Sequence, residues 1–214
     1  LCDAGKLLNI EEMRDNDYVI TTKELVQWCQ EEGLDLDKIT PSKFDSVLGE
    51  GTGAGMIFGN TGGVMEAALR TVYRVLEGKE APADFYQLRP VRGLSNRKEA
   101  EVTIAGKKLR VCILYGTAAA EKFLAEDMNG YHFVEVMTCP GGCISGAGQP
   151  DCGSVPVSDV VRKKRIQSLY QADEQAERRN SMDNPEIGTI YHEFFKEPLS
   201  MLSEKLLHTT YQGK

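Results

Sequence analysis

The chain has 214 residues, 41% of them hydrophobic and 27% charged, which is the composition of an ordinary globular protein with room for one sizeable core or two small lobes. Its formal net charge of -7 argues against a nucleic-acid partner, because phosphate backbones bind to basic faces. No apolar stretch approaches the ~20 residues that cross a bilayer, so we expect no membrane span. The basic run at residues 162–165 is interpreted as a solvated helix face rather than a docking patch.

The first 78 residues of the chain contain signals for a strand and for two helices. Residues 17–20 have the pattern of a short strand. A capping box from Thr21 to Glu24 then predicts the start of a helix. Residues 49–63 are rich in glycine, and the apolar spacing that follows predicts a helix ending at Gly78.

The middle of the chain has strand-like alternation. Residues 101–104 and 109–113 alternate between apolar and polar side chains, and the three residues between them suit a hairpin turn. A helix is expected at about residues 118–128. A mostly apolar strand at residues 131–137 then runs directly into Cys139.

The remainder of the chain is expected to be helical. Strands that alternate with helices indicate an α/β layer, here with a hairpin at its edge. Three further helices are predicted, each from one apolar face. The first face consists of Ile166, Leu169 and Tyr170, the second of Ile187, Ile190, Tyr191, Phe194 and Phe195, and the third of Leu199, Leu202, Leu206 and Leu207.

Six cysteines make metal or redox chemistry a candidate function. An even number could also form disulfides, but the α/β patterning favours a reducing compartment, and we expect a cytoplasmic protein. Cys29, on an apolar helix face, and Cys112, within a strand, are expected to fill the core. The six are Cys2, Cys29, Cys112, Cys139, Cys143 and Cys152.

The most informative stretch lies between Cys139 and Pro150. Cys139 and Cys143 are separated by three residues, two of them glycine, at the end of a predicted strand. Glycine lets a backbone bend around a bulky cluster and bring N–H groups close to its sulfides. A redox dithiol and a tight structural turn are the alternatives. The glycine-rich continuation as far as Pro150 favours an iron–sulfur site, with Cys2 as a third thiolate; Cys152 is a weaker candidate for a fourth.

Four segments of the chain resemble the [FeFe] hydrogenases, also called iron-only hydrogenases. Residues 135–143, followed by the glycine-rich residues 146–150, resemble the family's third cysteine motif, and residues 53–70 are similar to its glycine-rich segment. Residues 1–6 resemble the second cysteine motif, and residues 206–211 the family's C-terminal ending.

The resemblance implies a fold and a division of the chain. The family has two α/β lobes with the active site in the cleft between them. This chain would supply one α/β lobe, the edge of the other and C-terminal helices. Residues 1–214 would be the C-terminal part of the catalytic domain: 1–16 the end of the second-motif region, 17–150 the α/β lobe ending in the third motif, and 151–214 a helical C-terminal region.

The resemblance also implies a cofactor, the H-cluster, and the reversible reaction of two protons and two electrons to hydrogen. The H-cluster is a [4Fe–4S] cubane linked through one cysteine to a two-iron subcluster that carries carbon monoxide, cyanide and a bridging dithiolate. Cys143 matches the bridging cysteine, and Cys2 and Cys139 match cubane ligands. Further matches concern the two-iron subcluster: Met137 packs against it, Phe58 and Gly59 form part of its pocket wall, and Lys6 is the candidate cation for a cyanide ligand.

Three departures from the family pattern bear on its function, and two of them leave alternatives open. The motif lysine aligns with Gly5, unless Lys6 takes its place, and the motif glutamate aligns with Leu8. A buried cyanide without its cation is less well stabilised, so a hydrogenase-like sensor of low activity is an alternative. A hydrogenase-like iron–sulfur assembly protein without a two-iron centre is another. The third motif also carries Ala147 where glycine is usual.

The resemblance further implies partners. The first cysteine motif would lie upstream of Leu1, so an upstream segment or a separate subunit is expected to supply the fourth cubane cysteine. An electron carrier, such as a ferredoxin or an NAD(P)H-linked subunit, is also expected.

Two side chains near the third motif invite their own interpretation: His132 is expected to be a core histidine, and Glu135 to be either a proton relay or a buried hydrogen-bonded carboxylate.

Overall fold

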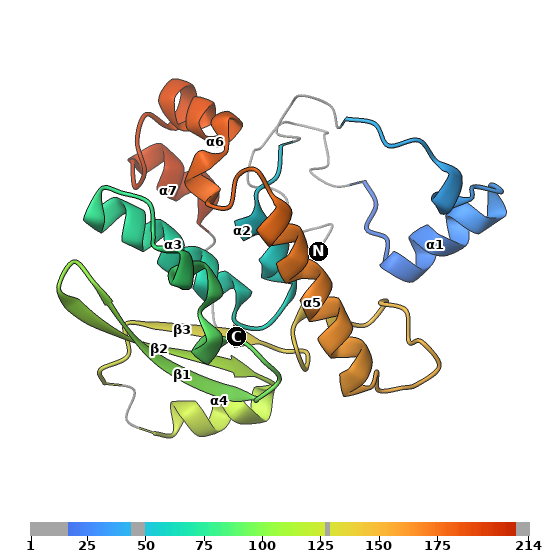
Figure 1. Cartoon of the computed structure of the whole chain (residues 1–214), viewed down its shortest axis with the longest axis horizontal. Coiled ribbons are helices and arrows are strands. Elements are labelled where there is room, and N and C mark those ends of the chain that lie inside the picture. The colour runs from blue at the N-terminus through green and yellow to red at the C-terminus, as the bar shows by residue number, and fades with distance from the viewer. Residues whose placement is uncertain (1–16, 44–49, 127–128, 209–214) are drawn as a thin grey trace. The chain divides into compact units, whose positions relative to one another are not determined.

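The computed structural model describes residues 17–43, 50–126 and 129–208. The chain divides into two compact units (Figure 1). One unit contains Glu50–Asn184, and the other combines Leu1–Gly49 with Pro185–Lys214. The larger unit contains the sheet and the third cysteine motif.

A three-stranded sheet forms the centre of the larger unit. Strand β1 (Arg97–Ile104) pairs antiparallel with β2 (Lys107–Tyr115). The two-residue turn between them has positive φ at both residues, as tight hairpins require. Helix α4 (Thr117–Leu124) then leads to β3 (Phe133–Met137), which lies parallel to β2. The predicted hairpin, helix and following strand are therefore confirmed, as is the α/β class.

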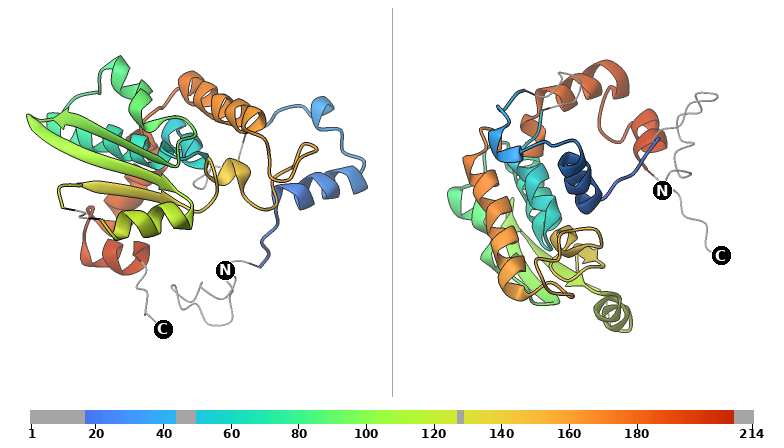
Figure 2. Two further views of the ribbon diagram at one scale, coloured as in Figure 1. Left: turned by 90° about the horizontal axis from the view of Figure 1, so that it is seen from below. Right: turned by 90° about the vertical axis from the view of Figure 1, so that its right-hand side faces the viewer.

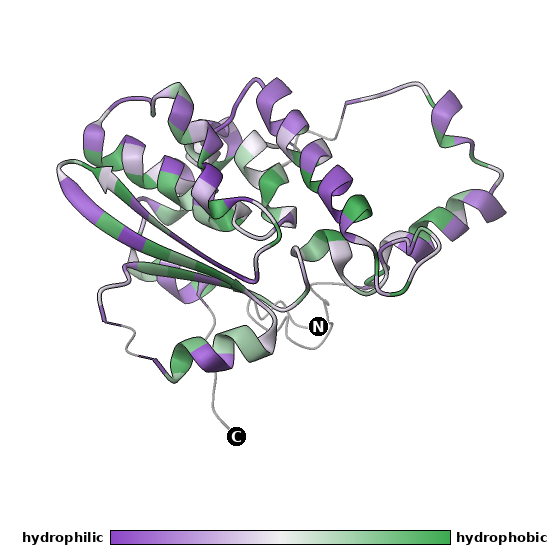
Figure 3. Cartoon of the chain, turned by 60° about the horizontal axis from the view of Figure 1, so that its bottom comes forward, coloured by the Kyte–Doolittle hydropathy of each residue, from purple (hydrophilic) through white to green (hydrophobic). Residues whose placement is uncertain are grey.

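The central strand β2 is buried on both faces of the sheet. Val111 and Ile113 join the core cluster beneath helix α3 (Gly63–Glu77), while Cys112 and Leu114 pack with α4 on the opposite face. All four side chains have an exposed fraction of 0%. Full burial of such a side chain stabilises the fold by roughly 1.5–3 kcal/mol. Figure 2 shows the sheet between the two helices, and Figure 3 shows that β2 and β3 are largely hydrophobic. Cys112 is confirmed as a core residue, and burial raises its thiol pKa.

The glycine-rich segment forms short helices before α3. Helix α2 (Gly53–Met56) continues into the 3₁₀ helix η2 (Ile57–Gly59). Helix α3 then begins after Gly62 and ends at Gly78, whose φ of 67° confirms the predicted stop. Across from α2 lies helix α5 (Asp159–Gln175), and the two share an apolar cluster. A Cβ at Gly53 would lie 2.2 Å from the Asp173 Oδ1, so glycine is what permits this close packing.

A buried ionic network joins α3 to α5. Arg70 donates to both carboxylate oxygens of Asp173 at 2.8 Å and to Glu66 at 2.8 Å, and all three side chains are 0% exposed. Arg92 also donates to Glu66, and Arg179 to Asp173. Burial opposes ionisation of Asp173, but the two arginines outweigh it and hold its pKa below the ordinary value. The network therefore fixes the spacing of the two helices.

The other unit is helical where it is described. Helix α1 (Thr22–Glu31) starts with the predicted capping box, in which Thr21 and Glu24 exchange hydrogen bonds. The strand predicted at residues 17–20 is wrong, because this segment is exposed and pairs with no strand in the described part of the chain. The predicted core position of Cys29 is also wrong, since α1 contains no buried residue. The predicted C-terminal helices correspond to α6 (Pro185–Ile190) with the π-helix η7 (Tyr191–Phe195), and α7 (Met201–Leu207).

Five further 3₁₀ helices lie in the described connections. They are η1 (Leu36–Lys38), η3 (Ala83–Gln87), η4 (Arg89–Val91), η5 (Cys143–Ser145) and η6 (Ser181–Asp183). Of these, η5 bears directly on the candidate site, because it begins at the second cysteine of the third motif.

Candidate metal centre

The loop that follows β3 carries two thiols on one tight turn. Cys139 is partly buried, Cys143 is exposed, and neither forms a disulfide. The N–H of Gly142 donates to the Cys139 carbonyl at 2.9 Å and closes the turn. Gly141 and Gly142 have φ values of 81° and 96°, which favour glycine. The strand end and the two glycines therefore present both sulfurs from a single short loop.

The glycine-rich segment packs directly against this turn. The N–H of Thr61 donates to the Gly141 carbonyl at 3.0 Å. A Cβ at Gly142 would lie 2.8 Å from the Thr61 nitrogen and 2.9 Å from the Asn60 Cα, which are backbone atoms that cannot swing away. The side-chain oxygens of Asn60 and Thr61 are buried and have no hydrogen-bond partner among the described residues. Two motifs about 80 residues apart thus meet as backbone against backbone.

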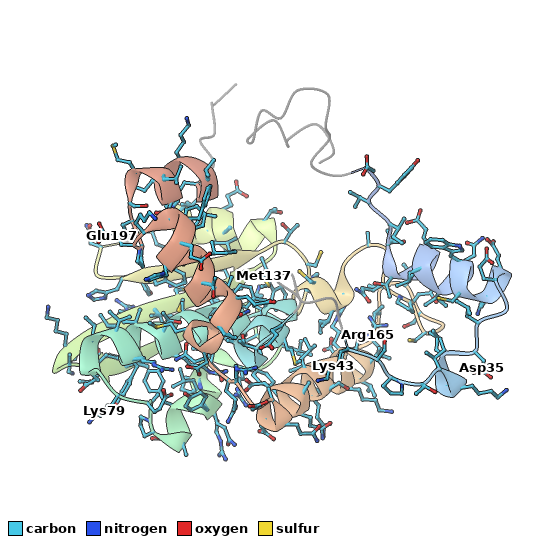
Figure 4. The ribbon with its side chains drawn as sticks, turned by 90° about the horizontal axis from the view of Figure 1, so that it is seen from above. Asp35, Lys43, Lys79, Met137, Arg165 and Glu197 are labelled. Atoms are coloured by element: carbon cyan, nitrogen blue, oxygen red, sulfur yellow. The ribbon has the colours of Figure 1, made fainter. Side chains whose placement is uncertain are left out.

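Three other predicted site residues lie on elements that adjoin the loop. Phe58 and Gly59 belong to η2, and a Cβ at Gly59 would lie 3.9 Å from Ile144 in η5. The Phe58 ring is 45% exposed. Met137 ends β3, two residues before the first cysteine, and is partly buried (Figure 4). The other predicted residues, Cys2 and Lys6, lie outside the described residues, as do Gly5 and Leu8.

Two arginines of α5 hold the segment after Cys143. Arg165 donates to the carbonyls of Ile144, at 2.6 Å, and Pro150. Arg162 donates to the Ser145 hydroxyl at 3.3 Å. Only the two lysines between these arginines are exposed, so the predicted solvated face is wrong for its arginines. Figure 4 shows Arg165 beside this part of the loop.

A buried pair of opposite charges lies behind the glycine-rich segment. Glu135 accepts hydrogen bonds from the N–H groups of Gly62, at 2.6 Å, and Met65, at 2.7 Å. It therefore caps the start of α3, where a carboxylate is favoured by the helix dipole. Lys98 donates to the Thr61 carbonyl at 3.0 Å. Burial raises the pKa of Glu135 and lowers the pKa of Lys98 to about 8. Of the two interpretations of Glu135, the buried hydrogen-bonded carboxylate describes its contacts.

Sequence reasoning missed Lys98, although a signal was present. In β1 the side chains of Lys98, Ala100 and Ile104 fall on the same face of the strand, and that face packs on the core. A lysine at such a position is unusual and marks a buried charge. His132 was expected in the core but is exposed, and its Nδ1 accepts a hydrogen bond from the Arg110 N–H at 3.0 Å.

The donor set of the loop fits an iron–sulfur cluster. Thiolates are the usual protein ligands of such clusters, and here a glycine turn offers two of them, with Cys143 exposed. Within the residues that the structure describes, no three His, Cys, Asp or Glu side chains gather as metal ligands. The predicted third thiolate, Cys2, is not among those residues.

Sequence comparison identifies the family. Residues 4–147 match the family described as "Iron only hydrogenase large subunit, C-terminal domain". The chain belongs to the iron-only hydrogenase family. Residues 159–214 match a second family, "Iron hydrogenase small subunit".

Two curated hydrogenases are similar over almost the whole chain. Iron hydrogenase 1 of Clostridium pasteurianum is 38% identical across 94% of this chain and 35% of its own length. The NADP-reducing hydrogenase subunit HndD of Solidesulfovibrio fructosivorans is 41% identical across 92% of this chain and 33% of its own length. The chain thus spans about a third of the length of these relatives.

A solved structure and a more distant relative complete the comparison. A variant of the [FeFe]-hydrogenase HydA1 from Chlamydomonas reinhardtii superposes with a TM-score of 0.71 at 34% identity, covering 92% of this chain and 56% of that chain. The cytosolic Fe-S cluster assembly factor narfl of Xenopus tropicalis is 29% identical across 94% of this chain and 42% of its own length. Among the described residues, no helix combines the length and apolarity of a membrane span.

Proposed function

We propose that this chain is the C-terminal part of an [FeFe] hydrogenase catalytic unit, which interconverts protons and hydrogen. The observation that carries the proposal is the packing of the Gly141–Gly142 turn on Asn60 and Thr61. It brings the third cysteine motif together with the glycine-rich segment, and both are the segments that resemble the family.

Each proposed residue has a defined task toward the H-cluster. Cys139 and Cys143 would hold the [4Fe–4S] cubane together with Cys2, and Cys143 would also be a ligand of the two-iron subcluster. Phe58, next to Gly59, offers an exposed ring that can exclude water from the pocket wall. Met137 would pack against the two-iron subcluster, and Lys6 would offer a cation to a cyanide ligand. When bound, the H-cluster would supply the redox chemistry that interconverts protons and hydrogen.

The proposal includes partners and a location. An upstream segment or a separate subunit supplies the fourth cubane cysteine, because three matching cysteines leave one iron without a protein ligand. A ferredoxin or an NAD(P)H-linked subunit delivers electrons; the relative named as an NADP-reducing hydrogenase subunit supports the second option. The location that we propose is the cytoplasm, on the sequence-based expectation of a reducing compartment.

The test compares Cys143→Ser with Cys152→Ser in the chain assembled with its upstream segment. Cys152 is an exposed thiol 3.5 Å from Arg165 and is therefore a matched control outside the turn. We expect Cys143→Ser to lose the infrared bands of metal-bound carbon monoxide and cyanide together with hydrogen evolution, because a hydroxyl is a poor ligand for soft metals. Cys152→Ser should retain both. Bands and turnover at the unsubstituted level in Cys143→Ser would exclude the bridging role.

An iron–sulfur assembly protein is the second candidate, favoured by the 29% identity to the Xenopus assembly factor. Such a protein would bind iron and sulfide but show no carbon monoxide or cyanide bands. A sensor would show the bands but turn over slowly with an artificial electron donor. The substitutions at Gly5 and Leu8 favour this third option. Infrared spectra and turnover rates therefore separate all three.

A further inference from the structure

Thr61 connects two functional segments through its backbone N–H and carbonyl, which belong to successive peptide groups. Its N–H donates to the Gly141 carbonyl, inside the turn between the two cysteines, at 3.0 Å. Its carbonyl accepts from the Lys98 ammonium, also at 3.0 Å. The neighbouring N–H of Gly62 donates to Glu135 at 2.6 Å. Two buried charges on the sheet thus hold the backbone that in turn holds the cysteine loop.

Burying the charges of Lys98 and Glu135 costs free energy, so we expect the two side chains to have a specific structural role. Lys98 and Glu135 are 7% and 6% exposed. Charges removed from water stabilise a fold little or not at all compared with well-packed apolar side chains. The hydrogen bonds found for both side chains go to backbone atoms: from Lys98 to Thr61 and Gly93, and to Glu135 from Gly62 and Met65. Their contacts therefore fix main-chain positions.

The charges on Lys98 and Glu135 act on one peptide group, that between Thr61 and Gly62. The cation on its carbonyl and the carboxylate on its N–H polarise this group and strengthen each other's hydrogen bond. Together they fix the adjoining Thr61 N–H, which donates to the Gly141 carbonyl. Since a Cβ at Gly142 would already collide with the Asn60–Thr61 backbone, the turn has no room to approach more closely. Loss of the cation should therefore let the turn move away from the glycine-rich segment.

We propose that Lys98 and Glu135 are positioning residues that fix the geometry of the loop between Cys139 and Cys143 and thereby set the reduction potential of the cluster on that loop. The effect on the potential rests on the proposed function. The effect on the loop does not, because it concerns the folded chain alone. Hydrogen bonds and backbone dipoles near cluster sulfurs are established determinants of such potentials.

The first experiment uses the iron-free, reduced chain. The alkylation rate of Cys139 by iodoacetamide is measured by peptide mass spectrometry in Lys98→Met, Glu135→Gln and the double variant. We expect an increase of about tenfold in each single variant, equivalent to ~1.4 kcal/mol of local opening. Because both residues act through the same backbone segment, the double variant should not exceed the larger single effect by more than about twofold.

Three controls separate positioning from general destabilisation. Lys108→Met removes an exposed cation from the same hairpin, where Lys108 pairs with Glu101. Ile104→Ala weakens the core below α3 without touching the loop. Lys98→Arg keeps the cation. All three should leave the Cys139 rate within about threefold of the unsubstituted chain. Equal acceleration in Ile104→Ala, or unchanged rates in both Lys98→Met and Glu135→Gln, would overturn the proposal; if Lys98→Met does not fold, Glu135→Gln decides.

The second experiment measures the cluster reduction potential in the chain assembled with its upstream segment. We expect the potential to shift in Lys98→Met and Glu135→Gln but not in Lys108→Met. A faster Cys139 reaction with an unchanged potential would confirm loop positioning and refute its link to the cluster. If the assembled chain binds no cluster at all, the proposed function fails, while the alkylation result still decides the positioning role.

Discussion

Gly142→Ala should disrupt the candidate site through sterics alone. Gly142 has φ 96° and ψ -160°, a backbone region that only glycine adopts readily, and forcing alanine into it costs ~1–3 kcal/mol. The new Cβ would also lie 2.8 Å from the Thr61 nitrogen and 2.9 Å from two Asn60 backbone atoms. Overpacking of this kind costs a further ~1–3 kcal/mol. We therefore expect a total loss of roughly 2–6 kcal/mol in the free energy of unfolding.

Gly153→Ala is the matched control for this prediction. Gly153 has φ 82°, but a Cβ there would meet no atom within 4 Å. It therefore carries the backbone strain without the collision, and its expected loss is about 1–3 kcal/mol. The difference between the two variants, roughly 1–3 kcal/mol, isolates the contact between the turn and the glycine-rich segment.

The assay is urea unfolding followed by far-ultraviolet circular dichroism. The single tryptophan, Trp28, lies in the other unit, so its fluorescence would not report on the unit that contains Gly142. Equal unfolding free energies for Gly142→Ala and Gly153→Ala would refute the reasoning, because the collision would then have no energetic consequence. A cysteine loop that follows β3 but gains no stability from packing on the glycine-rich segment would give that result.

Three further substitutions test the surroundings of the site. Asp173→Ala should destabilise the chain by ~3–5 kcal/mol in urea unfolding, because it leaves the buried cation of Arg70 and the neighbouring Arg179 without their shared carboxylate. The folded-state pKa of Lys98, about 8, lies below its ordinary value of 10.5, so the folded chain loses this proton before the unfolded chain does. The free energy of unfolding should therefore rise with pH between these values, by roughly 2 kcal/mol at about pH 9.5. Lys98→Met should abolish the rise, and an unchanged pH profile in that variant would contradict the assignment. Arg165→Met removes two hydrogen bonds to loop carbonyls and should accelerate alkylation of the loop thiols about fivefold; equal rates would show that the arginine is dispensable.

Local signals in the sequence predicted the elements well where the structure depends on neighbours in the chain. The capping box at Thr21 and the glycine stop at Gly78 are set by hydrogen bonds and φ values within one turn. The strand predicted at residues 17–20 failed, because a strand also needs a partner that no local pattern specifies. Trp28 has an exposed fraction of 57%. Its burial likewise depends on tertiary packing, which the spacing of apolar residues along a helix does not determine by itself.

The candidate site was predictable only in part, for the same reason. The cysteine spacing and the glycines identify the loop, since they encode ligand chemistry and backbone freedom directly. Lys98 escaped notice and Arg165 was misread as part of a solvated face, because each acts on backbone carbonyls far away in sequence, Lys98 on Thr61 and Arg165 on Ile144. Every residue has a backbone carbonyl that can accept a hydrogen bond, so no sequence motif marks the side chain that donates to one.

The last prediction concerns Gly5, which aligns with the family's cyanide-binding lysine and lies outside the described residues. Among the residues that the structure describes, the contacts that shape the cysteine loop include those of Thr61, Lys98 and Arg165, all within the unit Glu50–Asn184. We expect Gly5→Lys, which restores the cation, to change the cofactor without changing the loop. In the chain assembled with its upstream segment, a charge-assisted hydrogen bond to a buried cyanide, worth ~1.5–3 kcal/mol, should shift the cyanide infrared band and improve retention of the two-iron subcluster. The alkylation rate of the iron-free thiols should stay the same. A normal iron content with an unchanged infrared spectrum would mean that Lys6 or another group already supplies the cation, while a changed alkylation rate would mean that the first residues of the chain also shape the loop.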